Sequence, residues 1–101
     1  LDPQTLFDVM STSSGQTWAL THHCPVPGVV EGSAANRDYQ PGFSGNLMLK
    51  DLTLAQEVAK TASTASPMGA LAAQLFRLHA SSGHGDLDYA SVIKTLAGKA
   101  D

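Results

Sequence analysis

A lysine and an aspartate stand side by side, as Lys50 and Asp51, in a segment whose apolar residues recur at helical spacing. The segment reads GFSGNLMLKDLTLAQEVAKTAS, residues 42–63. No acidic residue lies three or four positions from Lys50, so its own helix offers this ammonium group no partner. On a helical wheel Asp51 falls on the apolar side, where an unpaired carboxylate is costly. That side also holds Met48, Leu52, Ala55, Val58, Ala59 and Ala62.

Two interpretations of this pair fit the spacing equally well. In the first, Asp51 caps a neighbouring helix or accepts hydrogen bonds from buried backbone, while Lys50 is merely solvated. In the second, Lys50 is held on a rigid helix for a ligand, to which its ammonium group donates hydrogen bonds. The spacing alone does not favour either one.

His22, His23 and Cys24 are consecutive and carry side chains that zinc prefers. A closed zinc site needs four ligands, usually in separated pairs, and adjacent side chains on a helix point about 100° apart. His79 and His84 lie far along the chain. We therefore expect ordinary surface or half-buried histidines, and no metal site.

The sequence also lacks the usual motifs for catalysis or nucleotide binding. No G-x-S-x-G elbow is present to expose a serine nucleophile. The glycines at 28, 32, 42 and 45 follow no predicted strand, so they do not form a dinucleotide phosphate loop. We expect no catalytic residue in this chain and no nucleotide binding by the chain alone.

Local signals predict an all-α fold, a compact bundle of about five helices with one long irregular loop. Asp2 and Pro3 give an N-cap followed by proline, which starts a helix. A short second helix covers residues 16–23. Residues 24–42 hold three prolines and three glycines and are predicted to form the loop. The first helix should bury Leu6, Phe7, Val9 and Met10.

Two further helices are predicted after the long one. Ser66 and Pro67 start the first of them, whose buried face should hold Met68, Leu71, Ala72, Leu75, Leu78 and His79. Its small residues, beginning with Gly69, allow another helix to approach closely. Asp88 should cap the last helix and Gly98 should end it. The inner stripe of that helix comprises Tyr89, Val92, Ile93 and Leu96.

Composition limits the classes of function. The chain has 101 residues, of which 43% are hydrophobic and 15% charged, with a net charge of −3. One domain is the natural expectation, and the scattered basic residues argue against nucleic-acid binding. No apolar run is long enough to cross a membrane, and the single cysteine excludes an internal disulfide. The opening LDPQ lacks a methionine, so we expect a piece of a longer polypeptide.

Trp18 and Phe43 stand on either side of the long loop. Each could be an ordinary core aromatic. Each could also line a cleft whose other wall lies outside this chain.

The segment LMLKDLTLAQEVA (47–59) resembles the cofactor-contacting signature, of the type Lys-Asp-Leu-x-x-Ala, in the C-terminal domain of β-hydroxyacid dehydrogenases. Other stretches are most similar to the 3-hydroxyisobutyrate dehydrogenase branch of that family. They are LFDVMSTSSGQTWAL, CPVPG, DYQPGF and PMGALAAQLFRLHASSGHGDLDYASVIKTL. The resemblance therefore covers essentially the whole chain.

This resemblance implies that residues 1–101 are the helical C-terminal domain of a two-domain NAD-dependent enzyme. Members of that family have an N-terminal Rossmann domain with G-x-G-x-x-G, a Ser-Gly-Gly substrate loop, and a catalytic lysine on the long helix between the domains, and all of these would be absent from this chain. The intact enzyme would move hydride from a small 3-hydroxy acid to NAD, forming a semialdehyde, as in valine catabolism. The fragment alone would be inactive, and NAD is preferred to NADP by resemblance only.

The resemblance also implies roles for individual residues. Lys50, Asp51 and Phe43 match cofactor-contacting positions, with Lys50 projecting into the interdomain cleft and Asp51 turned inward as an anchor. Trp18, Phe43 and His23 border the substrate cleft. His22 and His23 replace a tyrosine that relatives often carry after the tryptophan, which alters the polar detail of that wall. Ser63 stands where relatives usually have glycine at the helix end, so we expect mild backbone strain there.

The implied partners are the enzyme's own Rossmann domain, a small 3-hydroxy acid and further copies of the enzyme, with no nucleic acid and no membrane. The implied location is the cytoplasm in a bacterium or the mitochondrial matrix in a eukaryote. Two alternatives stay open. One is a relative that reduces tartronate semialdehyde or succinic semialdehyde, and the other is a non-catalytic helical interaction module.

Overall fold

The computed structural model describes residues 1–98 and contains five α-helices. They are α1 (Pro3–Ser11), α2 (Trp18–His23), α3 (Gly45–Thr61), α4 (Pro67–His79) and α5 (Val92–Leu96). Three shorter helical turns are η1 (Ala34–Arg37), η2 (Ala80–His84) and η3 (Tyr89–Ser91). Within these described residues the β structure amounts to one isolated bridge, between Ser44 and Asp88. The predicted all-α class is confirmed.

Side-chain caps fix the starts of several helices, because a cap satisfies backbone N–H groups that the helix leaves without a partner. Asp2 accepts a hydrogen bond from the Thr5 N–H at 3.1 Å, as predicted, and Pro3 is the first residue of α1. Ser44 caps α3 through the Leu47 N–H at 3.2 Å. Asp88 caps η3, which continues into α5.

The start of α4 differs in one respect from the prediction. The helix does begin at Pro67, but the Ser66 hydroxyl caps nothing. It accepts a hydrogen bond from the side-chain amide of Gln56 at 3.2 Å, which ties α4 to α3. The Ser66 hydroxyl oxygen, predicted to cap α4, therefore accepts a tertiary hydrogen bond from Gln56 instead.

The end of α3 confirms the strain expected at Ser63. This residue has a φ of +53°, in the left-handed region. The N–H of Thr64 donates to Ala59 O at 2.9 Å and the N–H of Ser63 to Lys60 O at 3.1 Å, which is the hydrogen-bond pattern of a Schellman motif. Glycine enters this conformation more cheaply than serine.

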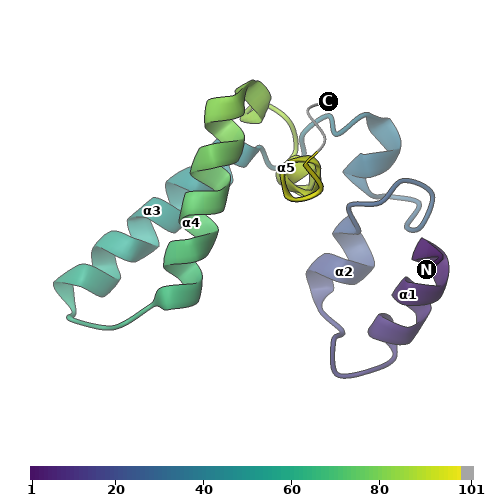
Figure 1. Cartoon of the computed structure of the whole chain (residues 1–101), viewed down its shortest axis with the longest axis horizontal. Coiled ribbons are helices and arrows are strands. Elements are labelled where there is room, and N and C mark those ends of the chain that lie inside the picture. Colours follow the sequence, from purple (N-terminus) through teal and green to yellow (C-terminus); the bar gives the residue numbers. More distant parts are fainter. Residues whose placement is uncertain (99–101) are drawn as a thin grey trace.

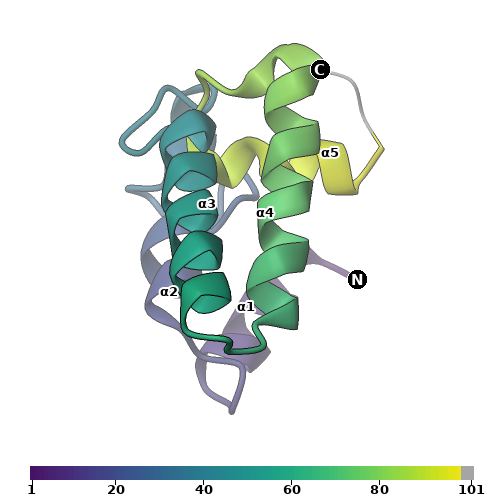
Figure 2. The same ribbon diagram turned by 90° about the vertical axis from the view of Figure 1, so that its left-hand side faces the viewer.

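The helices form two pairs, with α5 between them (Figure 1). In one pair α3 packs along α4, and in the other α1 packs on α2. Figure 2 shows α3 and α4 side by side, with α1 and α2 behind them. The chain measures 42 × 32 × 23 Å along its principal axes, with a radius of gyration of 14.5 Å.

The expected close approach to the small residues of α4 is confirmed at Gly69. A Cβ atom built on Gly69 would lie 2.7 Å from Gln56 Nε2 of α3 and 2.8 Å from Ser66 Oγ. A larger residue at this position would therefore have to displace the Gln56 side chain.

Most of the buried core comes from the segment predicted to be an irregular loop. Of the six buried hydrophobic residues in the described range, residues 24–42 supply four, Cys24, Ala34, Ala35 and Tyr39, and Ser33 is also buried there. Tyr39 packs with Ala35 and Ala90, and its hydroxyl donates to Pro25 O at 2.6 Å. The segment also contains η1, so it is an organised part of the core as well as a connection.

Several predicted buried faces are in fact exposed. On α3 the buried or half-buried residues are Gly45, Met48, Leu49, Leu52, Thr53, Gln56 and Ala59. Asp51, Ala55, Val58 and Ala62 are exposed, so placing them on the buried face was wrong. The same error applies to Leu6, Val9, Met10, Met68, Leu71, Leu78 and Leu96. Each of these helices is apolar over a wide arc, and the packing uses only part of it.

None of the described helices is long and apolar enough to cross a membrane.

Candidate functional site

Lys50 projects from an exposed, mainly apolar face of α3. Its side chain is exposed, and it forms no hydrogen bond or ion pair with any other residue in the range 1–98. Leu47 and Leu54, three residues before and four after it, are 46% and 50% exposed. The ammonium group is therefore available to a ligand and emerges between apolar side chains.

Asp51 does not turn inward as the sequence had suggested, because its side chain is exposed. At about 100° per residue, Asp51 lies on the side of α3 opposite the half-buried Leu49 and Gln56, and Gln56 contacts Ser66 at the start of α4. The prediction of a buried anchor is wrong. Asp51 instead accompanies Lys50 on the open face of the helix.

The residue that anchors the start of α3 is Asp88, which is 1% exposed. Its Oδ1 accepts hydrogen bonds from the N–H groups of Gly42 at 3.0 Å and Phe43 at 3.1 Å. Its Oδ2 accepts from the Ala90 N–H at 3.0 Å. One buried carboxylate thus holds the segment before α3 against the turn before α5, and it orients Phe43. Sequence reasoning found only its capping role, since its other partners lie 45 and 46 residues away.

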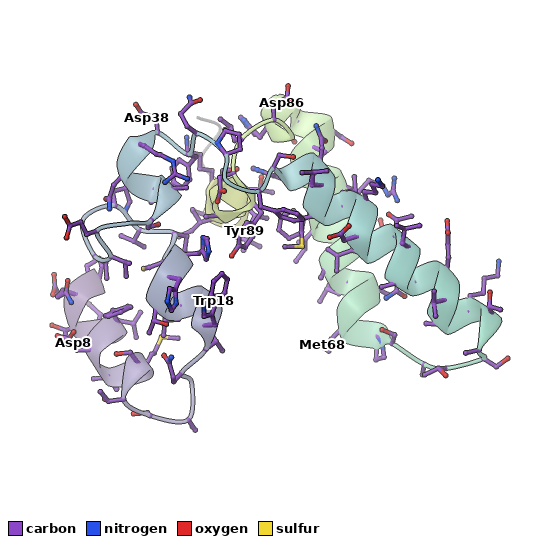
Figure 3. All side chains as sticks on the ribbon, turned by 180° about the vertical axis from the view of Figure 1, so that it is seen from behind. Asp8, Trp18, Asp38, Met68, Asp86 and Tyr89 are labelled. Atoms are coloured by element: carbon purple, nitrogen blue, oxygen red, sulfur yellow. The ribbon has the colours of Figure 1, made fainter. Side chains whose placement is uncertain are left out.

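Four side chains form a continuous aromatic row, which comprises Trp18, His23, Tyr89 and Phe43. The ring centroids of Trp18 and His23 are 4.7 Å apart, and those of His23 and Tyr89 are 5.5 Å apart. Tyr89 meets Phe43 edge-on, with 6.1 Å between centroids and 78° between planes. Figure 3 shows Trp18 on the side of its helix pair that faces α3 and α4, with Tyr89 at the junction of the two pairs.

The three residues expected to border a substrate cleft therefore lie in one row. Trp18 is 63% exposed, so it is not a core aromatic. Phe43 and His23 are half-buried. Tyr89, which joins them, was expected only as part of the inner stripe of the last helix. No local signal identifies its second role, because the contacts come from distant segments.

The row borders an apolar pocket of about 420 Å³ between α1, α2 and α5. Its lining includes Met10, Leu20, His23, Tyr89, Ile93 and Leu96. Burial raises the pKa of the Tyr89 phenol, and the neighbouring Asp88 carboxylate raises it further. The phenol therefore stays protonated at neutral pH and can act as a hydrogen-bond donor.

The remaining histidines have structural partners. His22 stacks on Trp18, with 4.9 Å between ring centroids. His79 is fully buried, with Nδ1 2.6 Å from Thr95 Oγ1 and Nε2 2.7 Å from Ser91 Oγ. Burial lowers the pKa of His79, and the nearby His84 and Lys94 lower it further. In the part of the chain that the structure describes, no three His, Cys, Asp or Glu side chains converge as a metal site would require.

Comparison with known proteins identifies relatives of the chain. Residues 1–96 match the family described as "NAD-binding of NADP-dependent 3-hydroxyisobutyrate dehydrogenase". The probable 3-hydroxyisobutyrate dehydrogenase of Mycobacterium tuberculosis is 45% identical over 100% of this chain and 34% of its own length. The NAD-dependent L-serine dehydrogenase of Pseudomonas aeruginosa is 45% identical over 93% of this chain and 32% of its own. The mitochondrial 3-hydroxyisobutyrate dehydrogenase of Mus musculus is 41% identical over 95% of this chain and 29% of its own length.

Solved structures agree with these relatives. The M. tuberculosis 3-hydroxyisobutyrate dehydrogenase with L-serine superposes with a TM-score of 0.91 at 45% identity, over 95% of this chain and 33% of that one. A Salmonella typhimurium 3-hydroxyisobutyrate dehydrogenase shares the fold, with a TM-score of 0.71 at 24% identity, over 90% of this chain and 30% of that one. The chain spans about a third of the length of the relatives it matches. Because the family match runs through 96 of its residues, the chain belongs to the NAD-binding domain family of 3-hydroxyisobutyrate dehydrogenases.

Proposed function

We propose that this chain is the helical C-terminal domain of an NAD-dependent dehydrogenase that oxidises a small 3-hydroxy acid to a semialdehyde. In the reaction, the carbon that bears the 3-hydroxyl group gives a hydride to the nicotinamide, and the hydroxyl proton passes to a base. The phosphate-binding glycines and the Ser-Gly-Gly substrate loop belong to an N-terminal Rossmann domain, and the base, a lysine, belongs to the long helix between the two domains. The chain alone does not turn over substrate.

The observation that carries the proposal is the state of Lys50. This residue presents an ammonium group without a partner in residues 1–98, on a rigid helix and between exposed leucines. Such a group suits the nicotinamide ribose side of a dinucleotide, where it donates hydrogen bonds to oxygen atoms. Asp51, exposed beside it, and Phe43, just before the helix, complete the cofactor side of the cleft.

The aromatic row supplies the substrate side. Trp18 and Phe43 give it apolar surface, and His23 adds one polar group between them. A wall of this kind suits a small acid whose alkyl part needs apolar contact. The exposed apolar side chains of α3 and α4, such as Val58 and Met68, support association with the Rossmann domain or with a second subunit.

NAD is the proposed cofactor. The family description names both NAD binding and NADP dependence, while the P. aeruginosa relative is named NAD-dependent. Discrimination between NAD and NADP depends on the ribose 2′ position, which the Rossmann domain contacts in dinucleotide-binding enzymes.

The test is a steady-state comparison of Lys50→Ala, Lys50→Arg and the control Lys60→Ala in the full-length enzyme. Lys60 lies in the last turn of the same helix and is also exposed. Lys50→Ala should lower kcat/KM for NAD at least tenfold, or about 1.4 kcal/mol of transition-state binding. Lys50→Arg should keep part of the activity because it keeps the charge, and Lys60→Ala should match the wild type. Unchanged kinetics in Lys50→Ala would remove Lys50 from the cofactor site.

L-serine is a second candidate substrate. One relative at 45% identity is named an L-serine dehydrogenase, and a solved relative at the same identity contains L-serine. L-serine is itself a 3-hydroxy acid, so the reaction class is the same. Comparing kcat/KM for 3-hydroxyisobutyrate and L-serine, with tartronate and succinic semialdehydes in the reverse direction, ranks the candidates.

A further inference from the structure

We infer that Tyr89 is a positioning residue for the substrate cleft: its ring, held between Phe43 and His23, fixes the spacing of the cleft wall. This inference rests on the proposed role of the aromatic row in substrate binding. Tyr89 is not a catalytic residue in this view. It acts on substrate through the two side chains that it separates.

The backbone of Tyr89 is tied directly to that of Phe43. The Tyr89 N–H donates to Phe43 O at 2.7 Å. The preceding residue, Asp88, accepts from the N–H groups of Gly42 and Phe43 on one oxygen and from the Ala90 N–H on the other. These hydrogen bonds therefore hold the backbones of Tyr89 and Phe43 together as one unit.

The ring of Tyr89 then links this unit to α2. It lies 5.5 Å from the His23 ring at 51° and 6.1 Å from the Phe43 ring at 78°. Both distances lie in the range preferred by aromatic pairs, about 4.5–7 Å between centroids. Within residues 1–98, Tyr89 is the aromatic residue whose ring contacts both the end of α2 and the residue that leads into α3. Within the row, the ring of Tyr89 is the contact that connects Phe43 to His23 and, through His23, to Trp18.

The ring, rather than the hydroxyl, carries this role. The Tyr89 hydroxyl forms no hydrogen bond with any residue in the described range 1–98, so phenylalanine preserves every contact of the row. The other tyrosine offers a matched control. Tyr39 is buried and its hydroxyl donates to Pro25 O at 2.6 Å, so Tyr39→Phe loses a hydrogen bond without removing a member of the row.

The experiment uses the full-length enzyme and measures KM for the 3-hydroxy acid and for NAD separately, together with kcat and the melting temperature. Tyr89→Leu should raise KM for the 3-hydroxy acid at least fivefold and KM for NAD by a clearly smaller factor, because Phe43 borders both sides of the cleft whereas His23 borders the substrate side alone. Tyr89→Phe should keep KM for the 3-hydroxy acid within twofold of wild type. Tyr39→Phe should lower the melting temperature and leave both KM values unchanged. Should Tyr89→Leu fail to fold, Tyr89→Met, with a flexible side chain of similar length, serves in its place.

Several results would overturn the inference. For Tyr89→Leu, these are an unchanged KM for the 3-hydroxy acid, or an equal rise in KM for the 3-hydroxy acid and for NAD. For the other variants, they are a Tyr89→Phe enzyme as impaired as Tyr89→Leu, or a Tyr39→Phe enzyme whose KM for the 3-hydroxy acid rises as much as that of Tyr89→Leu. A wild-type enzyme without activity on any 3-hydroxy acid would overturn the proposed function as well. An active wild type with an insensitive Tyr89→Leu variant would overturn the role of Tyr89 alone.

Discussion

Replacing Asp88 by alanine should destabilise the domain more than any surface change, because one buried carboxylate serves three backbone donors. Gly42, Phe43 and Ala90 would each lose a hydrogen bond of 3.0–3.1 Å to an acceptor that is 1% exposed. A hydrogen bond to a charged group contributes about 1.5–3 kcal/mol. Losses within one network are not additive, so we expect a total of about 3–5 kcal/mol. That is a large part of the roughly 5–15 kcal/mol that stabilises a typical domain.

Asp88→Asn sharpens this test. An asparagine keeps one acceptor oxygen, so it can serve either the pair Gly42 and Phe43 or the cap at Ala90, but not both. The expected loss is about half that of alanine. Asp86→Ala is the matched control, because Asp86 is exposed and bonds only the Asn46 side-chain amide among the described residues. It should cost less than about 0.5 kcal/mol.

Urea unfolding measures the free energy of each variant, and native-state hydrogen exchange reports the individual amides. In Asp88→Ala the amides of Gly42 and Phe43 should lose protection before the middle of α4 does. A loss of stability below about 1 kcal/mol, or unchanged protection at these two amides, would refute the role given to Asp88.

Three further predictions concern strain, pH and the isolated chain. Ser63→Gly should stabilise the fold by about 0.5–1 kcal/mol, measured by urea unfolding, because Ser63 has a φ of +53° and glycine adopts that conformation without steric cost. Burial lowers the pKa of His79 from its ordinary value of 6.5, so the unfolded chain binds the proton more readily. The free energy of unfolding should have its full value above pH 6.5 and fall as the pH drops towards the folded pKa of His79, by at most about 1.4 kcal/mol per pH unit. His79→Gln should flatten this pH dependence. By calorimetry, the 101-residue chain alone should bind NAD no more tightly than about 1 mM, and a micromolar constant would contradict the two-domain proposal.

Helix ends could be predicted from the sequence because capping is local. The structure confirms the predicted caps at Asp2 and Asp88, and it confirms the start at Pro67 although the Ser66 hydroxyl does not cap it. Gly98, with a φ of +73°, follows α5 as expected. Each of these positions depends on residues within one turn of the helix end.

The buried side of each helix could not be predicted in the same way. A helical wheel finds apolar arcs, but α3 is apolar over more of its surface than α4 covers. Leu54 and Val58 fit an apolar stripe as well as Leu49 and Leu52 do, and they are nevertheless exposed. The direction from which the partner helix approaches decides the outcome. That direction depends on tertiary contacts such as the one between Gln56 and Ser66.

The candidate site was predictable residue by residue but not as a whole. Resemblance to a family indicated Trp18, His23 and Phe43 separately. The structure joins them through Tyr89, whose place depends on hydrogen bonds between segments about 40 residues apart. The N–H of Gly45 donates to Leu87 O at 2.8 Å, and that of Asn46 to Gly85 O at 2.9 Å. No periodicity in the sequence announces this pairing.

The same pairing gives both sides of the proposed cleft a common support. The segment that leads to Tyr89 lies close against the start of α3: the Asn46 N–H donates to Gly85 O at 2.9 Å, and a Cβ atom on Gly85 would displace the exposed Asn46 side-chain amide. The start of α3 in turn holds Phe43 and carries Lys50 in its second turn. Disturbing Asp88 should therefore affect cofactor and substrate together, whereas removing the ring of Tyr89 should affect the substrate wall more than the cofactor side. Separate KM values for NAD and for the 3-hydroxy acid therefore distinguish Asp88, which supports both sides of the cleft, from Tyr89, which supports the substrate wall.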